Sequence, residues 1–222
     1  MGETIELEAA DGHRLGGYKV GPEGEAIGGI VVLQEIFGVN HHIRSICDRL
    51  AGEGFVAVAP ALFDRITPDF QSGYSEQDVT TARGFIPKVD WDAMLLDTEA
   101  AAKALADDKP KALLGFCLGG SLAYLAAVRQ VGYAASVCFY GGKIVGFADQ
   151  APLCPTQMHF GDQDHGIPMS DVETIKAKRP DCEIHVYPAG HGFNCDERGS
   201  YSAGDAKLAF GRSVEFLERQ IS

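Results

Sequence analysis

The amino-acid sequence predicts an α/β protein with a mainly parallel sheet of about seven or eight strands and helices on both faces. Short apolar runs rich in β-branched residues alternate along the chain with segments of helical periodicity. Two of these runs, residues 28–35 and 55–60, are apolar almost throughout, which is typical of strands buried on both faces of a sheet. A third run ends in a glycine-rich turn that leads directly into a helical segment. Strand–helix alternation of this kind is what parallel strands require, because each must be joined to the next by a crossover.

The length and composition indicate one globular domain. The 222 residues suffice for a single hydrophobic core, and the sequence contains no repeats, low-complexity segments or linkers, so we expect one domain over residues 1–222. The hydrophobic content of 45% and the charged content of 23% are ordinary for soluble proteins. The formal net charge of −12 disfavours nucleic acid and anionic membranes as partners.

The N-terminus and the cysteines indicate the compartment. The first twelve residues lack the basic start and apolar core of a secretory signal, and no apolar run approaches membrane-spanning length. Six cysteines lie apart in the sequence without a C-x-x-C pair, which argues against a zinc ribbon or a thioredoxin motif. Thiols within apolar patterns suit a reducing environment, so we expect a cytoplasmic protein with free cysteines.

The sequence up to residue 88 predicts a hairpin, two buried strands and one capped helix. Residues 4–8 and 15–20 flank a turn at Asp11-Gly12 and should pair as an antiparallel hairpin. Asn40 should cap a helix that ends at Gly52 or Gly54. Between the second buried strand and the next helix, residues 61–88 contain scattered prolines and glycines. This segment predicts loops and short helices over the carboxyl end of the sheet, where α/β enzymes build substrate walls.

The rest of the chain continues the alternation. A helix capped by Asp90 should run to about residue 107. The further expected strands are 112–114, 134–139, 156–160 and 183–187, and the further expected helices are 121–128, about 169–178 and about 205–221.

The turn between the strand at 112–114 and the following helix has the pattern of a nucleophile elbow. Its sequence, GFCLGG over residues 115–120, corresponds to G-x-S-x-G with Cys117 where serine usually stands. A helix N-terminus beside the sulfur favours the thiolate form. The alternative is an ordinary strand-to-helix turn with a buried cysteine.

A cysteine nucleophile requires a base and an orienting carboxylate, and both follow in the expected order. Asp164 lies in the turn after the strand at 156–160, and His191 lies between glycines after the strand at 183–187. The spacing places each residue at the end of a successive strand, which indicates a Cys117–His191–Asp164 triad. Asp162 is the competing acid and His165 the competing base.

The remaining histidines and one glutamate are further candidates for a site. His41 and His42 point to opposite sides of a helix start and do not suggest a joint metal site. Strand positions favour structural roles for the remaining three histidines, which are His13, His159 and His185. Glu35 ends the first buried run, where α/β-hydrolases place the loop that supplies one N–H of the oxyanion hole. A carboxylate there is explained if it holds the thiol proton at rest; the alternative is a surface glutamate at a strand end.

Four ordered motifs together resemble the dienelactone hydrolase (carboxymethylenebutenolidase) family, whose members are small cysteine hydrolases of the α/β-hydrolase fold. The motifs are QEIFG at 34–38, GFCLGG at 115–120, GDQDH at 161–165 and GHGF at 190–193. The resemblance covers nearly the whole chain. It implies hydrolysis of cyclic enol-lactones in aromatic compound degradation by a cytoplasmic, often monomeric enzyme that needs neither metal nor cofactor.

The resemblance also implies residue roles. Cys117 is the nucleophile, His191 the base and Asp164 the acid. Glu35 hydrogen-bonds the resting thiol, and the backbone N–H groups of Ile36 and Leu118 form the oxyanion hole.

The chain departs from the family at the arginines that bind a substrate carboxylate. Cys195 occupies the position four residues after the histidine, where the enzymes that define the family have an arginine. The remaining candidates are Arg198 and Arg83, of which Arg83 is preferred because its segment is expected to overhang the site. We therefore expect a small lactone or activated ester as substrate. The alternatives are a general carboxylesterase or thioesterase, and a ligand-binding homologue without activity.

Overall fold

The computed structural model describes residues 2–221. The chain divides into two compact units, Met1–Ala112 and Leu113–Ser222, and the described part of each is presented by itself. The expectation of one domain over residues 1–222 remains a prediction.

The strands of the first unit form the predicted hairpin and the two buried strands. Their order is β1-β2-β4-β3, and the bounds are β1 Glu3–Glu8, β2 Arg14–Val20, β3 Gly28–Leu33 and β4 Phe55–Pro60. Strand β2 is antiparallel to both β1 and β4, whereas β3 and β4 are parallel. Every residue of β3 is buried, which confirms the prediction made from its apolar run.

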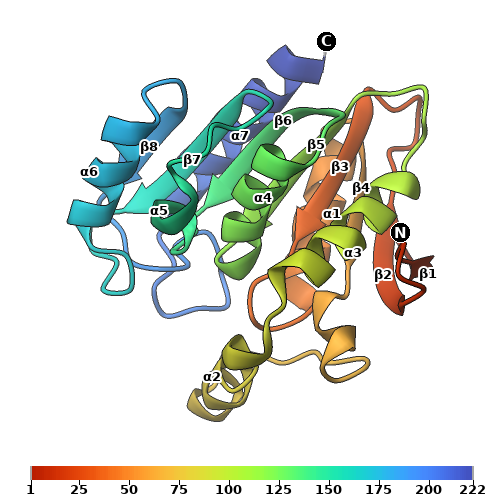
Figure 1. The fold of residues 1–222 in the computed structure, drawn as a ribbon, viewed down its shortest axis with the longest axis horizontal. Helices are drawn as coiled ribbons and strands as arrows, with labels where there is room; N and C mark the ends of the chain where they lie inside the picture. The colour runs from red at the N-terminus through yellow and green to blue at the C-terminus, as the bar shows by residue number, and fades with distance from the viewer. Residues whose placement is uncertain (1, 222) are drawn as a thin grey trace. The chain divides into compact units, whose positions relative to one another are not determined.

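Two capped helices cover opposite faces of β3 and β4 (Figure 1). In α1, His41–Gly52, the Asn40 side chain accepts from the Ile43 N–H, as predicted. In α3, Trp91–Lys103, the Asp90 carboxylate accepts from two backbone N–H groups. The helix α3 ends about four residues earlier than expected. The chain leaves the helix there, and the Leu105 side chain packs over Gly29 of β3. A Cβ added at Gly29 would lie 2.9 Å from Cδ1 of Leu105.

The irregular segment between β4 and α3 contains three short helices, as predicted. They are η1 Leu62–Arg65, α2 Glu76–Arg83 and η2 Ile86–Lys88, and α2 lies beyond the carboxyl end of β3 (Figure 1). Gly38 has a φ of 78° and pairs with Gln71, and a Cβ at Gly38 would collide with the Phe70 carbonyl. Arg65 anchors the segment through a bidentate pair with Asp97, whose side chain is fully buried in α3.

The strands of the second unit follow the order β5-β6-β7-β8. Their bounds are β5 Lys111–Phe116, β6 Tyr133–Phe139, β7 Thr156–Gly161 and β8 Glu183–Tyr187. Strand β7 is parallel to both β6 and β8, with Ser136 opposite Thr156 and Gln157 opposite Glu183. The parallel pairs confirm the predicted α/β class.

Helices lie on both faces of these strands. Figure 1 shows α4, α5 and α6 on one face and α7 on the other. Their bounds are α4 Leu118–Arg129, α5 Ile144–Phe147, α6 Met169–Lys178 and α7 Ala203–Ile221. Helix α4 begins three residues earlier than predicted, directly after Cys117. Helix α5 was not predicted because four residues are too short to show a helical period.

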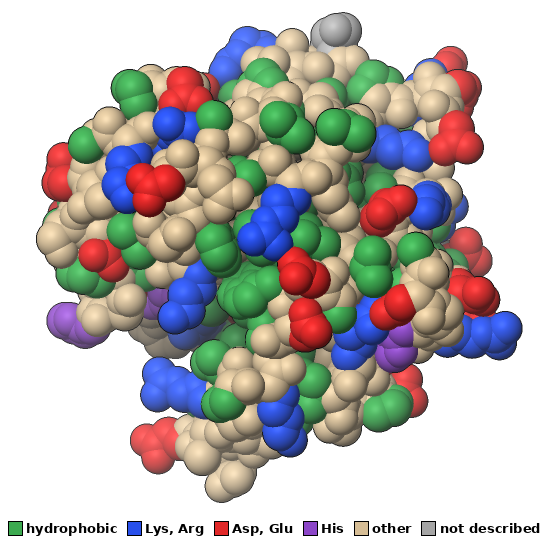
Figure 2. Space-filling model, in the orientation of Figure 1, with side chains coloured by type: hydrophobic (Ala, Val, Ile, Leu, Met, Phe, Trp, Pro, Cys, Tyr) green, Lys and Arg blue, Asp and Glu red, His purple; other side chains and the backbone are tan. Residues whose placement is uncertain are grey.

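The visible surface of α6 carries both signs of charge in close alternation (Figure 2). Lys176 pairs with Glu173 at 2.9 Å, and Lys178 pairs with Asp149 at 2.8 Å. None of the helices within residues 2–221 combines the length and the apolar character needed to cross a membrane.

Candidate active site

Cys117 occupies a sharp turn between β5 and α4. Its backbone has a φ of 55° and a ψ of −110°, a conformation rarely adopted by residues with a side chain. A Cβ at Gly115 would collide with the Gly119 carbonyl, and one at Gly120 with the Phe139 carbonyl. The turn therefore requires glycine at both positions, which is the steric reason for the elbow motif.

The first turn of α4 lies beside the sulfur-bearing residue. Leu118 is the first helical residue, so its N–H has no acceptor within the helix and is available to a ligand. Ser121 braces the turn, because its hydroxyl donates to the Cys117 carbonyl at 3.3 Å and accepts from the Lys143 N–H at 3.0 Å. Placing Cys117 at this helix end sets the positive end of the helix dipole near the thiol.

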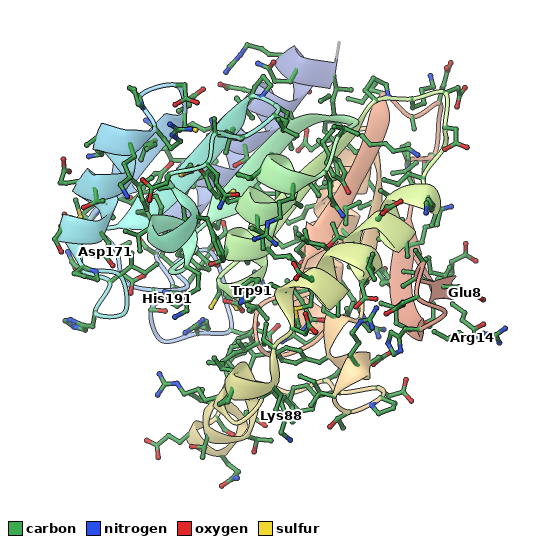
Figure 3. The ribbon with its side chains drawn as sticks, in the orientation of Figure 1. Glu8, Arg14, Lys88, Trp91, Asp171 and His191 are labelled. Carbon is green, nitrogen blue, oxygen red and sulfur yellow. The ribbon has the colours of Figure 1, made fainter. Side chains whose placement is uncertain are left out.

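Three side chains of the second unit form a continuous chain of contacts. His191 Nε2 lies 3.2 Å from Cys117 Sγ, and His191 Nδ1 lies 2.7 Å from Asp164 Oδ2. Cys117 follows β5, Asp164 follows β7 and His191 follows β8, so these three side chains come from the carboxyl ends of three strands. Figure 3 shows His191 in the loop beyond the strand ends. The spacing in the sequence predicted this meeting, since parallel strands end at the same edge.

Asp164 contacts the histidine, whereas the competing residues do not lie in this chain of contacts. The Asp164 side chain is almost fully buried, and its Oδ1 accepts from the Gly166 and Ile167 N–H groups at 2.8 and 3.2 Å. One carboxylate oxygen is thus held by the backbone, and the other remains for His191. Asp162 and His165 are both exposed.

The surroundings of His191 change its proton affinity. Burial lowers its pKa, but the Cys117 sulfur and the hydrogen-bonded Asp164 carboxylate outweigh this effect and raise the pKa of His191 to about 10. The imidazole side chain remains 27% exposed, which leaves it accessible to a substrate or to water. A protonated imidazole beside a sulfur is the arrangement that stabilises a thiolate.

The loop that carries His191 is held by its own residues. The Ser200 hydroxyl donates to the His191 carbonyl at 2.6 Å. Gly192 has a φ of 75°, and a Cβ there would lie 2.5 Å from Nη1 of Arg198, so the guanidinium packs against the residue next to the histidine. Cys195 is fully buried, and a cysteine side chain supplies no positive charge. Ser200 was not predicted, because no motif surrounds it in the sequence.

Three predicted site residues belong to the first unit. Glu35 is fully buried, and its Oε2 accepts from the Tyr74 hydroxyl at 3.1 Å. Asn40 in turn donates to the Tyr74 oxygen at 3.1 Å. A glutamate at an exposed strand end is therefore excluded. Ile36 is buried beside it, and Arg83 is exposed on the last turn of α2. The contact of Tyr74 with Glu35 was not predicted, because its irregular segment has no periodicity that would indicate where the side chain points.

His159 and His185 lie in hydrogen-bond networks along β7 and β8. His159 is fully buried, with Nδ1 at 2.8 Å from the Tyr187 hydroxyl and Nε2 at 2.8 Å from Gln157 Oε1. Burial keeps the pKa of His159 well below its usual value. His185 Nε2 lies 2.9 Å from Glu183 Oε1. These contacts agree with the structural roles expected from the strand positions.

The comparisons with known proteins agree on one family. The model of the dienelactone hydrolase family matches residues 15–221. A Synechocystis protein named "Putative carboxymethylenebutenolidase" is 35% identical over 212 residues, which cover 86% of each chain. The carboxymethylenebutenolidase of Pseudomonas putida is 32% identical over 228 residues, which cover 97% of this chain and 95% of that protein.

Solved structures share the same fold. A crystal structure described as "Putative Dienelactone Hydrolase", from Klebsiella pneumoniae, superimposes with a TM-score of 0.85 at 29% identity and covers 98% of each chain. The Pyrococcus furiosus esterase Pf2001 superimposes with a TM-score of 0.74 at 15% identity, which shows the likeness of fold alone. The predicted α/β-hydrolase fold is thereby confirmed.

Proposed function

The chain belongs to the dienelactone hydrolase family and is a carboxylic ester hydrolase, and from this premise we propose that it cleaves lactones or activated esters through a Cys117–His191–Asp164 triad. The observation that carries the proposal is the pair of contacts made by His191, 3.2 Å to the sulfur and 2.7 Å to the carboxylate. A base in contact with both a nucleophile and an orienting acid is the arrangement that activates a thiol.

The first half of the proposed reaction forms an acyl-enzyme. With its raised pKa, His191 keeps the proton while the Cys117 thiolate attacks the substrate carbonyl carbon. The resulting oxyanion accepts hydrogen bonds from the backbone N–H of Leu118 and, as the family resemblance implies, from that of Ile36. The carbon–oxygen bond then breaks, His191 gives its proton to the leaving oxygen, and a thioester to Cys117 remains.

The second half releases the product. His191, now neutral, takes a proton from water as the water oxygen attacks the thioester carbonyl. The carbon–sulfur bond breaks, the carboxylic acid leaves, and the thiolate and the protonated imidazole are restored. Asp164 keeps Nδ1 protonated throughout, so that Nε2 faces the sulfur.

Glu35 is proposed to act before the substrate binds. We propose that, in the absence of substrate, the Cys117 thiol keeps its proton and donates a hydrogen bond to this carboxylate. When substrate displaces Glu35, the thiol proton passes to His191, which gives the thiolate and the protonated imidazole of the first step. Its complete burial and its anchoring by Tyr74 support a defined role rather than that of a surface charge.

The direct test is hydrolysis of dienelactone and of simple aryl esters by the wild type and by Cys117→Ala. We expect the substitution to reduce kcat/KM by at least about a thousandfold while the circular dichroism spectrum stays unchanged. Mass spectrometry of the wild type should detect an acyl adduct on Cys117 with a slow aryl ester. Substantial turnover by purified Cys117→Ala would overturn the triad, and stoichiometric binding without turnover by the wild type would favour a ligand-binding protein.

Selection for an anionic substrate is proposed to be weaker than the family name suggests. Cys195 supplies no positive charge, and the net charge of −12 repels anions. Arg198 packs against Gly192, beside the base, which supports it over Arg83 as the remaining contact for a carboxylate.

The arginines can be tested by comparing dienelactone with its neutral methyl ester. Arg198→Ala should lower kcat/KM for the free acid by about ten- to a hundredfold, the value of one charge-assisted pair, and change the ester much less. Arg83→Ala should leave both nearly unchanged. A strong preference for the free acid that survives both substitutions would show that the anion site lies elsewhere.

A further inference from the structure

Tyr140 shares an unusual backbone conformation with the nucleophile. It follows β6 directly and has a φ of 37°. Among the described residues of the second unit, only Cys117 and Tyr140 have a side chain and a positive φ. Conformations of this kind persist where the surrounding structure enforces them, and they are concentrated at functional sites.

The neighbours of Tyr140 account for its conformation. Its N–H donates to the His159 carbonyl of β7 at 2.7 Å. The next residue, Gly141, packs against the first turn of α4, where a Cβ would lie 2.8 Å from both Gly120 C and Ser121 N. The chain must therefore turn sharply between β7 and α4, and that turn aims the Tyr140 ring at the loop after β8.

The ring of Tyr140 contacts that loop on both sides of Gly192. Its centroid lies 5.1 Å from the His191 ring, with an interplanar angle of 57°. It also lies 5.6 Å from the Phe193 ring in an edge-to-face arrangement. Tyr140 and Phe193 are both fully buried, so the contact is a rigid part of the core rather than a surface packing.

We propose that Tyr140 is a positioning residue that holds the His191 imidazole in line between Cys117 and Asp164. The contacts of Nδ1 and Nε2 of His191 fix the two ends of a line through the ring. They resist rotation of the ring plane about that line only weakly. A buried aromatic ring packed against the imidazole supplies that resistance. Misplacement of a catalytic group by about 1 Å can cost about a hundredfold in rate. The proposal rests on the proposed function, in which His191 is the base.

The alternative is that Tyr140 is an ordinary core aromatic. Tyr124 in α4 provides a matched control, because it is also fully buried but its hydroxyl donates to the Gln150 carbonyl at 2.8 Å. The same substitution at the two tyrosines removes comparable apolar area, so a general loss of stability should affect both variants alike.

The experiment measures the rate of alkylation by iodoacetamide at Cys117, located by peptide mapping, from pH 5 to pH 10, together with kcat and KM on an aryl ester. The proteins are the wild type, Tyr140→Leu, Tyr140→Phe, Tyr124→Leu and, as a reference, His191→Asn. We expect Tyr140→Leu to lower kcat about ten- to a hundredfold with a smaller change in KM, and its alkylation profile to move toward that of His191→Asn. Tyr140→Phe, which keeps the ring, should retain the wild-type profile, and so should Tyr124→Leu.

Wild-type profiles in Tyr140→Leu, or equal changes in Tyr140→Leu and Tyr124→Leu, would overturn the proposal. If Tyr140→Leu fails to fold, Tyr140→Gly replaces it, because glycine accepts the positive φ without strain. Absence of turnover in the wild type would contradict the proposed function alone, since alkylation still reports whether Tyr140 governs the His191–Cys117 pair.

Discussion

His191 and His159 are two imidazoles of the same unit with opposite proton affinities. Both have a partner at each ring nitrogen. His159 lies within β7, and His191 lies in the loop after the neighbouring strand β8. The pKa of His191 is raised to about 10, whereas that of His159 is held well below its usual value.

The charge of the partners explains the difference. His191 lies between a carboxylate and a sulfur, each of which stabilises the protonated ring against the cost of burial. Complete burial lowers the pKa of His159, and the neutral side chains of Tyr187, Gln157 and Ser213 do not offset it. The positive charges of His185 and Arg212 lower this pKa further. Hydrogen bonds from neutral groups therefore leave the pKa of a buried histidine low, whereas charged partners raise it.

The largest expected effect comes from removing the charged partner of His191. Asp164→Asn keeps the shape of the side chain but removes its charge, and it can stabilise the wrong tautomer of the imidazole. We expect kcat to fall by about a thousand- to ten-thousandfold. Steady-state kinetics on an aryl ester measures the loss.

The matched control for Asp164→Asn changes a neutral partner of the other histidine. Gln157→Leu removes a hydrogen bond to His159 and should reduce stability while kcat falls less than about threefold. Comparable losses of kcat in both variants would show that hydrogen bonding, rather than charge, distinguishes the two histidines.

A smaller effect is expected on stability at acid pH. The unfolded state binds a proton at His159 below about pH 6.5, whereas the folded state keeps this ring neutral. His159 therefore lowers the free energy of unfolding by about 1.4 kcal/mol per pH unit as the pH falls below that value. Urea denaturation from pH 7.5 to pH 5 measures the slope.

The variant His159→Gln should remove this contribution and flatten the acid slope, whatever its effect on stability at pH 7.5. His185→Gln, in the neighbouring strand, should retain most of the slope. An unchanged slope in His159→Gln would mean that the buried ring already binds a proton in the folded state. His191 acts in the opposite sense: its raised pKa stabilises the folded protein at low pH, and that contribution is lost as the pH rises from about 6.5 toward 10.

The smallest effect is expected from the buried glutamate of the first unit. If Glu35 restrains the resting thiol, Glu35→Gln should increase the alkylation rate of Cys117 in the free protein by about threefold to tenfold at pH 7. A substrate-like anion should accelerate alkylation of the wild type and have less effect on the variant. Equal rates in both proteins would show that Glu35 does not restrain the thiol.

Local sequence was sufficient for most of the fold. Strands β4 and β8 and helix α6 have the predicted bounds, because apolar runs, capping residues and glycines are read directly from the chain. The order of the elbow, Asp164 and His191 along the chain was also visible, since parallel strands bring their carboxyl ends to one edge. The α/β-hydrolase fold and the family follow from these patterns.

Tertiary structure decided what depends on neighbours distant in the sequence. Asp164 rather than Asp162 meets His191 because two backbone N–H groups hold one of its oxygens and leave the other for the imidazole. The opposite pKa shifts of the two histidines, the anchoring of Glu35 by Tyr74, and the ring of Tyr140 against His191 have no local signature. Burial and electrostatic interactions depend on distances in space, and only the folded chain sets those distances.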